Sequence, residues 1–249
     1  MSVTKLNRLA ETHHSLLCLN MDFLPKYGTT ILQQGQAVLG LAYPHIVAVK
    51  FNLAYYISSD IAALGTLILN AHAKRLYTIL DGKFGDVGHT TERYADWARS
   101  LEVDAVTCNP YMGEEAIEPF EEAGVYPFVV AVPTTSTAPI PNTRLRGMLT
   151  EPTIWKEQVA LRCDDKGRGI VIGANSPANI SWYRRRNSEG WILCPGVGAQ
   201  GGIASEVVKA GRRLDGSGVL VSVGRSILTT YDVAAAAAAM NKEVNKCRR

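Results

Sequence analysis

The sequence predicts a single-domain (β/α)₈ barrel. Apolar runs rich in β-branched and aromatic residues alternate with segments of helical periodicity, which is typical of βαβ units and a parallel sheet. Eight such runs occur within 249 residues, a length typical of one closed barrel. Because composition never breaks and no low-complexity linker occurs, residues 1–249 are expected to form one domain. A doubly wound open sheet is the alternative, although no glycine-rich dinucleotide turn follows the first run.

Eight segments carry the strand signal. Each is a short, mainly apolar run bounded by polar or turn-forming residues. The run FVVAV at 128–132 is apolar throughout, which is typical of a strand buried on both faces of its sheet. In chain order the expected strands are 15–21, 45–51, 76–80, 103–108, 126–132, 169–173, 191–194 and 219–223.

Helical periodicity fills most of the intervals between these strands. Apolar residues recur there three or four positions apart, so each segment can bury one face against the sheet. The expected helices are 57–73, 91–101, 114–123, 154–161, 178–187, 203–213 and 234–244. The irregular stretch 133–152 holds four prolines. A loop of this length in a compact domain is typical of an active-site lid or a disordered segment.

The charge balance gives no reason to expect a nucleic-acid partner. The net charge is only +3, and hydrophobic residues make up 47% of the chain, as in an ordinary water-soluble protein. The basic residues are scattered, and the densest run, Arg184-Arg185-Arg186, is interpreted as a solvated helix face. An anionic small substrate is compatible with this balance, but charge alone does not argue for one.

Cysteine use and apolar patterning indicate a cytoplasmic protein. Five cysteines, at positions 18, 108, 163, 194 and 247, include no CxxC pair and are interpreted as reduced core thiols. Charged residues at positions 5, 8 and 11 precede any apolar run, unlike in a signal peptide. The longest apolar stretch, 51–73, is interrupted by polar residues and is not expected to span a membrane.

Polar residues gather where the expected strands end. The carboxyl ends of barrel strands meet on one face, where enzymes of this architecture hold their active sites. We therefore expect these side chains to form one site. Along the chain they are Asp22, Lys50, Asp81, Lys83, Asn109, Thr134, Thr135, Ser136, Gln200 and Arg225.

The last two strand ends predict a phosphate site. In such barrels phosphate is frequently bound by the loops after strands seven and eight. Here those loops read PGVGAQGG (195–202) and GRS (224–226). Glycines such as Gly196 and Gly224 let backbone N–H groups approach an anion, and Arg225 offers a forked donor that matches phosphate. Pro195 and Gln200 complete this candidate set.

Each of these features also has a plainer interpretation. An Asp-x-Lys-x-x-Asp spacing arises by chance in a chain that is 20% charged, and Lys50 could be a strand-end lysine that reaches solvent. His13, His14 and His45 have no carboxylate or thiol at metal-ligand spacing, so we expect them to be structural and expect no metal site. The functional interpretation depends on the recurrence of such residues at equivalent positions of successive units.

Several strings together resemble one enzyme family. DGKFGDVGHT (81–90) is similar to the signature of the orotidine-monophosphate decarboxylases, Asp-x-Lys-x-x-Asp followed by a threonine. PGVGAQGG (195–202) and VGRSI (223–227) resemble the two phosphate-loop signatures of that family. DAVTCNPYMGEEAIEPF (104–120) and VAVKFNLAYY (47–56) resemble its branch with longer loops. The likeness runs in order over nearly the whole chain.

The resemblance implies decarboxylation of orotidine 5′-monophosphate to UMP, without a cofactor, by a homodimer whose active sites are shared across the interface. Lys50, Asp81 and Lys83 would form an alternating row of charges, completed by Asp86 of the partner subunit. Lys83 would stabilise and protonate the carbanion at C6. Asp22 and Lys50 would contact ribose hydroxyls, Thr90 would reach across the interface towards the sugar, and Gln200 and Arg225 would hold the phosphate. The candidate substrate-binding set also contains four residues from the strand ends and their loops, Asn109, Pro195, Gly196 and Gly224.

The chain departs from the family pattern at two places. TTST (134–137) stands where a Ser-Asn-Pro-like segment is expected, so Thr135 and Ser136 are both candidates for the pyrimidine contact. Gly82 stands where a small side chain is more usual, and Phe84 stands where a charged one is common.

Two alternatives to this function stay open. One is a metal-dependent sugar-phosphate decarboxylase or aldolase of the same barrel group, such as keto-gulonate-phosphate decarboxylase or hexulose-phosphate synthase. Lys50 and the glutamine-bearing loop 195–202 argue against it. The other is a non-catalytic protein that binds phosphate ligands on this scaffold, and the complete set of charged residues argues against that.

Overall fold

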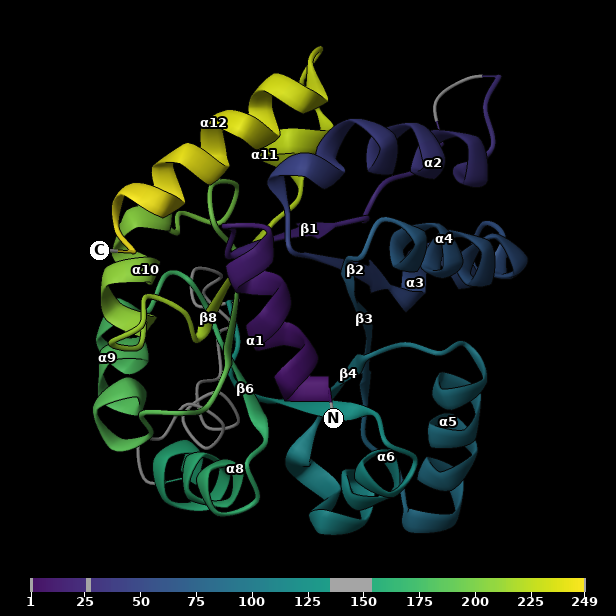
Figure 1. Cartoon of the computed structure of the whole chain (residues 1–249). Helices are drawn as coiled ribbons and strands as arrows, with labels where there is room; N and C mark the ends of the chain where they lie inside the picture. Colours follow the sequence, from purple (N-terminus) through teal and green to yellow (C-terminus); the bar gives the residue numbers. More distant parts are fainter. Residues whose placement is uncertain (1, 26–27, 135–153, 249) are drawn as a thin grey trace, which may run out of the picture.

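A closed parallel barrel forms the centre of the computed structural model, which describes residues 2–25, 28–134 and 154–248. Its eight strands pair in chain order, and β1 (Leu17–Asn20) pairs with β8 (Val219–Val223) to close the barrel. Helices form an outer ring around the strands (Figure 1). The predicted (β/α)₈ fold is confirmed. The open-sheet alternative is wrong, because an open sheet would leave its first and last strands with unpaired edges.

Every predicted strand is present. The other six are β2 (Ala48–Asn52), β3 (Tyr77–Phe84), β4 (Ala105–Cys108), β5 (Tyr126–Val132), β6 (Gly169–Ile172) and β7 (Ile192–Pro195). The largest difference from the sequence prediction is β3, which continues past Leu80 to Phe84. The added residues form a bulge that carries two charged side chains of the candidate site.

The helices of the ring follow the strands in turn. The longer ones are α2 (Ile31–Ala42), α4 (Ile61–Ala73), α5 (Gly88–Ser100), α9 (Pro177–Arg186), α10 (Ala204–Gly211) and α12 (Val233–Lys246). Shorter ones are α3 (Leu53–Ile57), α6 (Glu118–Glu122), α8 (Leu161–Asp165) and α11 (Arg225–Leu228). Single helical turns are η1 (Tyr43–His45), η2 (Pro110–Met112) and η3 (Glu114–Ala116), and η4 (Ile154–Ala160) is a π-helix of seven residues.

Helix capping explains two differences from the predicted helices. The helix expected at 57–73 begins at Ile61, because the Asp60 carboxylate accepts hydrogen bonds from two N–H groups of the first turn. Helix α2 is not predicted by periodicity, since its sequence ILQQGQAVLGLA carries two interior glycines. A capping box starts it, in which Thr30 and Gln33 bond to each other's backbone N–H groups.

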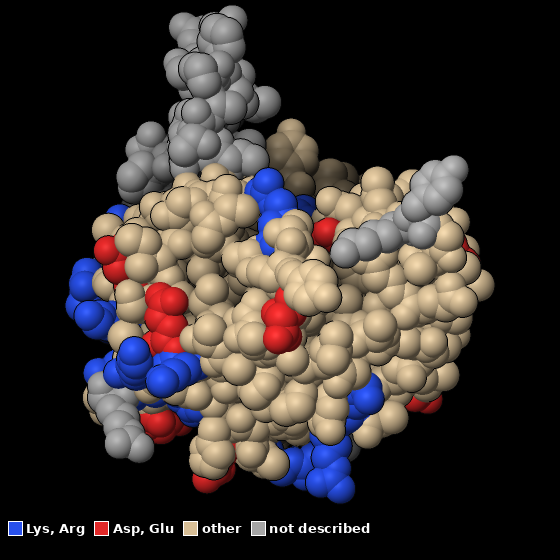
Figure 2. All heavy atoms as spheres, turned by 90° about the horizontal axis from the view of Figure 1, so that it is seen from above, with Lys and Arg blue, Asp and Glu red and all other residues tan. Residues whose placement is uncertain are grey.

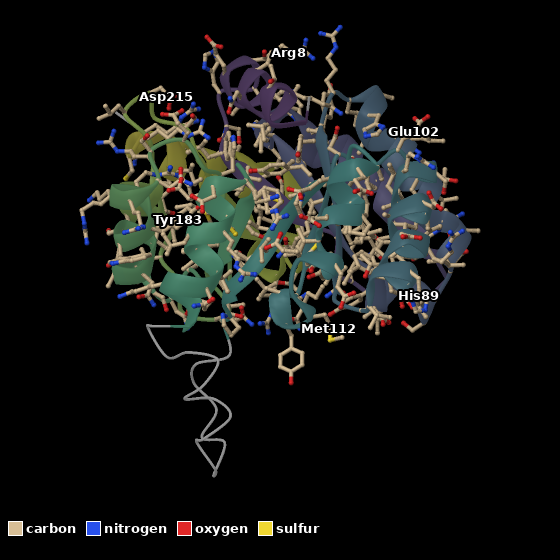
Figure 3. All side chains as sticks on the ribbon, turned by 90° about the horizontal axis from the view of Figure 1, so that it is seen from below. Arg8, His89, Glu102, Met112, Tyr183 and Asp215 are labelled. Carbon is tan, nitrogen blue, oxygen red and sulfur yellow. The ribbon has the colours of Figure 1, made fainter. Side chains whose placement is uncertain are left out.

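Helix α1 (Ser2–Thr12) lies across the amino-terminal end of the barrel (Figure 1). Its apolar residues Leu6, Leu9 and Ala10 are buried beneath it. The side-chain oxygen of Asn7 accepts a hydrogen bond from the Trp191 indole N–H at 2.8 Å. Figure 3 shows Arg8, Glu102 and Asp215 at this end and His89 and Met112 at the opposite end. The amino-terminal end is therefore closed, and the candidate site lies at the other.

An ion-pair cluster ties α1 to the barrel. Lys5 Nζ lies 2.5 Å from Asp104 Oδ1, and the Thr78 backbone N–H donates to Asp104 Oδ2 at 2.9 Å. His72 Nε2 lies 3.6 Å from the same carboxylate. Burial opposes the charge of Asp104, but these partners hold its pKa below its usual value.

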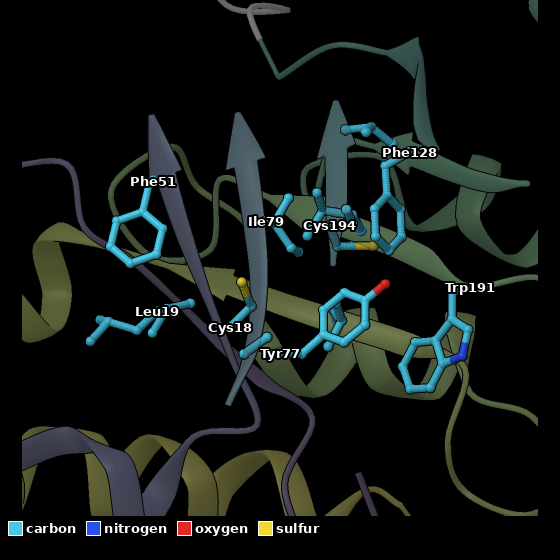
Figure 4. Packing of buried hydrophobic residues seen from close by; sticks show 14 of the residues in the cluster. Cys18, Leu19, Phe51, Tyr77, Ile79, Phe128, Trp191 and Cys194 are labelled. Carbon is cyan, nitrogen blue, oxygen red and sulfur yellow. The ribbon is translucent and has the colours of Figure 1, made fainter. Parts of the chain in front are cut away.

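The core fills the barrel and the space between barrel and helices. Figure 4 shows Cys18, Leu19, Phe51, Tyr77, Ile79, Phe128, Trp191 and Cys194 packed around the strands. All five cysteines are free thiols, and every one except Cys247 is buried. The prediction of reduced core thiols is thus confirmed for four of the five.

The arginine run of α9 is only partly a solvated face. Arg185 and Arg186 are exposed, as expected. Arg184 is half-buried and donates hydrogen bonds to five backbone carbonyls, of Asn187, Ser188, Gly190, Gly211 and Gly218. Its interpretation as a solvated residue is wrong, because the guanidinium donates to carbonyls at the ends of helices and loops.

The rest of the surface agrees with a scattered charge distribution. Figure 2 shows basic and acidic side chains in small separate groups among uncharged residues on the face that it presents. No helix in the described part of the chain is both long and apolar enough to cross a bilayer.

Candidate active site

The carboxyl ends of the first three strands bring charged side chains into a row. The Lys50 ammonium forms an ion pair with Asp81 and lies 3.9 Å from Asp22 Oδ2. Lys83 Nζ lies 2.7 Å from Asp81 Oδ1. The charges therefore alternate in sign from Asp22 to Lys83, and the structure places Lys50, Asp81 and Lys83 side by side as the sequence predicts.

Burial differs along the row. The side chains of Lys50 and Asp81 are only 5% and 7% exposed, whereas that of Lys83 is 57% exposed. A lysine that merely reached solvent would not be buried, so the plainer interpretation of Lys50 is wrong. Lys83 is the member of the row whose ammonium remains open to a ligand.

Lys50 and Asp81, at the centre of the row, hold each other in their charged forms. Burial opposes the charge on Lys50, but the carboxylates of Asp81 and Asp22 outweigh it and raise the Lys50 pKa. Burial also opposes the charge on Asp81, yet Lys50 and Lys83 hold the pKa of that carboxyl well below its usual range. For Asp22 burial prevails, and its pKa is raised despite the attraction of Lys50. Lys50 and Asp81 are consequently a fixed ion pair at neutral pH.

A bulge in β3 sets the direction of these side chains. The register between β3 and β4 shifts between Leu80 and Phe84, so that Thr107 is the only residue of β4 opposite residues 81–83. Lys83 has a φ of +47°, in the left-handed region that non-glycine residues rarely adopt. Such conformations persist where surrounding contacts hold them, and they cluster at functional sites.

The two departures from the family pattern, Gly82 and Phe84, form one packed unit. A Cβ on Gly82 would lie 2.3 Å from the Phe84 ring, so a larger residue there would have to displace the ring. The ring is buried, with its centroid 5.0 Å from that of Tyr94 and 5.3 Å from that of Phe120. The phenylalanine therefore occupies the space that a side chain at position 82 would need.

Thr107 is a site residue that sequence reasoning missed. Its hydroxyl donates a hydrogen bond to Asp81 Oδ1 at 2.7 Å and accepts one from the Lys83 backbone N–H at 2.9 Å. Threonine is common in β-strands, so its presence inside an apolar strand does not indicate that it has a role in the site.

A cavity of about 300 Å³ opens beside the row, at the ends of β1, β7 and β8. Its lining residues are Asn20, Asp22, Tyr55, Gly196, Val197, Ala199, Gln200, Ser222, Gly224 and Arg225. The two predicted phosphate loops thus meet at one cavity, together with Asp22. Within the described residues, the side chains of Gln200 and Arg225 make no hydrogen bond or ion pair, so both are free to bind an anion.

Glycines shape the loop that follows β7. Gly196, Gly198 and Gly201 have φ values of +98°, +75° and +85°. A Cβ on Gly196 would lie 2.8 Å from Gln200 Oε1, so the glutamine side chain folds directly over this backbone. A side chain at position 196 would displace Gln200, and glycine also avoids left-handed strain there.

Three further lining residues were not predicted from the sequence. Asn20 and Ser222 lie within β1 and β8, and Tyr55 lies in α3, whereas the prediction considered residues that follow the strands. The Ser222 hydroxyl donates to Asn20 Oδ1 at 2.6 Å and orients that amide.

Asp86 and Thr90 are not brought into the row. Asp86 Oδ1 accepts a hydrogen bond from the Val87 backbone N–H at 2.8 Å, and within the described residues Asp86 forms no ion pair. Thr90 lies in the first turn of α5. A single chain therefore assembles part of the predicted charged set.

Asn109 also lies apart from the cavity beside the row. Its Oδ1 accepts a hydrogen bond from the Tyr111 N–H at 3.0 Å and caps η2. It instead lines a larger cavity of about 440 Å³ between η2, η3, β5 and α8, which contains none of the predicted catalytic residues. Thr135 and Ser136, and most of the predicted lid at 133–152, lie outside the described residues.

Comparison with known proteins points to one family. Residues 15–240 match the Orotidine 5′-phosphate decarboxylase / HUMPS family. The orotidine 5′-phosphate decarboxylase of Herpetosiphon aurantiacus is 32% identical over 244 residues, covering 92% of this chain and 89% of the relative. That of Thermomicrobium roseum is also 32% identical over 244 residues, with coverage of 90% and 85%.

Solved structures agree with this match. Leishmania donovani OMP decarboxylase superposes with a TM-score of 0.83 at 26% identity, covering 99% of this chain and 98% of that one. Leishmania donovani UMP synthase gives a TM-score of 0.85 at 29% identity over 98% of this chain, which spans only 56% of that longer protein. Together with the barrel and its loops, these likenesses show that the chain belongs to the orotidine 5′-phosphate decarboxylase / HUMPS family.

Proposed function

We propose that this protein decarboxylates orotidine 5′-monophosphate to UMP, a step of pyrimidine nucleotide synthesis. The observation that carries the proposal is the alternating row of Lys50, Asp81 and Lys83 beside a cavity lined by Gln200 and Arg225. The cavity suits a phosphate, and the row presents an ammonium to the group at the other end of the nucleotide. The names of the relatives support the same activity.

The chemistry requires a cation at the reacting carbon. When the bond from C6 to the carboxylate breaks, CO₂ leaves and the electron pair stays on C6 with no adjacent π-system to delocalise it. The Lys83 ammonium stabilises that charge and then gives its proton to C6, which leaves a neutral amine that regains a proton from water. Asp81 accepts a hydrogen bond from the Lys83 ammonium and orients it, and Lys50 keeps Asp81 ionised.

The remaining contacts supply binding energy. Gln200 and Arg225 would bind the phosphate, and Asp22 and Lys50 would bind ribose hydroxyls. The Asp22 Oδ1 atom is buried without a hydrogen-bond partner among the described residues, which suits a carboxylate that waits for a hydroxyl donor. Energy from these non-reacting groups orients the pyrimidine against Lys83.

A homodimer with shared sites is part of the proposal. Asp86 lies three residues beyond Lys83 yet forms no ion pair in the described single chain, so its carboxylate is available to the row of a second subunit. Tyr111 is 81% exposed on the segment after β4, and Met112 is also exposed. Apolar exposure near the site is the kind of surface that a second subunit would cover.

A metal-dependent sugar-phosphate enzyme is the second candidate, since the family includes such activities by name. In those enzymes carboxylates hold a divalent cation that stabilises an enediolate. Here the Lys50 ammonium already lies between the carboxylates of Asp22 and Asp81, in the space that such a cation would need. The fixed lysine therefore favours the nucleotide decarboxylase.

The test is to mix purified protein with orotidine 5′-monophosphate and follow the ultraviolet change, with and without a chelator. We expect decarboxylation to UMP at the same rate in both. Loss of activity with the chelator, restored by magnesium, would favour the second candidate. Binding of the nucleotide without turnover would instead favour a non-catalytic binding protein.

A further inference from the structure

Thr107 has a position that neither the charged row nor the phosphate cavity explains. It is 2% exposed, does not line the cavity of Gln200 and Arg225, and is the only residue of β4 opposite the bulge at 81–83. Resting on the proposed function, we infer that Thr107 is a positioning residue for the decarboxylation. Its hydroxyl holds the Asp81 carboxylate and the Lys83 backbone in one arrangement, which fixes the Lys83 ammonium against C6.

The direction of the two hydrogen bonds is determined by the donors. A backbone N–H can only donate, so Thr107 Oγ1 accepts from Lys83 N at 2.9 Å. The single hydroxyl proton is then left for Asp81 Oδ1, at 2.7 Å. Neither bond can reverse, since a carboxylate held ionised has no proton to give.

These bonds close a ring around Lys83. Its backbone N–H binds Thr107, Thr107 binds Asp81 Oδ1, and the same Oδ1 accepts from Lys83 Nζ at 2.7 Å. Lys83 is thus held at both ends, through its backbone and through its ammonium. Because the bulge leaves no other residue of β4 opposite 81–83, the threonine is also the part of that strand that supports the left-handed backbone at Lys83.

Two substitutions separate the hydroxyl from the shape of the side chain. Thr107→Val keeps the β-branched shape that suits a buried strand but removes both hydrogen bonds. The Lys83 N–H then loses its acceptor, and Asp81 Oδ1 loses one of its two donors. Thr107→Ser keeps the hydroxyl and removes only a methyl group.

The experiment measures kcat, KM, UMP binding and thermal stability for both variants beside the wild type. A hydrogen bond to a charged group contributes enough free energy that its loss in Thr107→Val should lower kcat by about 10- to 100-fold. KM and the UMP dissociation constant should change less than about threefold, because the substrate-binding cavity is intact. Thr107→Ser should retain kcat within about threefold of the wild type.

Three results would overturn the inference. Thr107→Val could keep wild-type kcat, in which case the hydroxyl positions nothing that matters to the reaction. It could lose UMP binding and thermal stability together with kcat, in which case the residue only supports the fold. Thr107→Ser could fail as badly as Thr107→Val, in which case the methyl group and not the hydroxyl is needed. A wild-type protein that does not turn over would instead refute the proposed function itself.

Discussion

Removing the Arg225 guanidinium tests the assignment of the phosphate site. In the described residues this side chain makes no hydrogen bond or ion pair, and it is exposed at the edge of the cavity that Gln200 also lines. Arg225→Ala should therefore leave the fold and its thermal stability unchanged. Any loss of function then reports on the ligand alone.

The size of the effect follows from the bonds that are lost. A guanidinium–phosphate contact is charge-assisted and often bidentate, and each such bond is worth about 1.5–3 kcal/mol. Loss of one or two of them should raise KM for orotidine 5′-monophosphate roughly 10- to 1,000-fold. The kcat should also fall somewhat, because phosphate binding energy helps to orient the reacting end. Gln200→Ala is the matched variant and should have a weaker effect of the same kind, since its amide is neutral.

The assay compares the nucleotide with the nucleoside orotidine, which has no phosphate. Steady-state decarboxylation of both substrates is followed for the wild type and Arg225→Ala. We expect the two proteins to process orotidine with similar, very low kcat/KM values while they differ strongly on the nucleotide. If Arg225→Ala impairs orotidine as much as the nucleotide, the residue supports the reacting ring or the fold, and the phosphate site is elsewhere.

Three further predictions test the dimer, the amino-terminal cluster and the bulge. Inactive Lys83→Ala and Asp86→Ala homodimers should regain activity when they are mixed and their subunits exchange, because one of the two sites in a heterodimer carries neither substitution. Verified heterodimers that stay inactive would refute the shared site. Asp104→Asn should lower the free energy of unfolding at pH 7 by about 1.5–3 kcal/mol. Because the folded pKa of Asp104 lies below its ordinary value of 3.8, its stabilisation is complete above that pH and is lost as pH falls below it. Denaturant unfolding should therefore show the difference in stability between wild type and variant shrinking as the pH falls below 3.8. A difference that is independent of pH would contradict the cluster. Gly82→Ala should lower the free energy of unfolding by about 1–3 kcal/mol, because the added methyl group contacts the Phe84 ring. Adding Phe84→Leu to this variant should reduce that loss, because the smaller side chain leaves room for the methyl group. Additive costs in the double variant, measured in the same unfolding experiments, would show that the two positions are independent.

Most of the fold could be predicted from the sequence, because barrel strands buried on both faces leave a strong apolar signal. The eight strands and most of the ring helices are examples. Helix α2 could not be predicted, since its interior glycines weaken the helical signal and the capping box at Thr30 is a short polar pattern. Helix α1 covers the barrel end through contacts far apart in sequence, such as Asn7 with Trp191, which periodicity does not reveal.

The site residues that could be predicted from the sequence are those whose own side-chain charge is needed for the chemistry. Lys50, Asp81 and Arg225 are charged residues at strand ends, and the structure places them at one face. The supporting residues could not be predicted in this way. Thr107 and Ser222 act by donating hydrogen bonds from inside strands, where threonine and serine are ordinary residues. The bulge at Lys83 is also invisible in sequence, because a left-handed lysine depends on its neighbours in space.

Turnover by Lys83→Ala tests most directly whether this ammonium drives the decarboxylation. The side chain is 57% exposed and bonds only to Asp81 among the described residues, so its removal should leave the barrel folded. Single-turnover decarboxylation of orotidine 5′-monophosphate should be abolished while UMP still binds in the cavity of Gln200 and Arg225. A positioned general acid contributes about 100-fold or more, so a variant that retains more than about a tenth of the wild-type rate would contradict the role of Lys83.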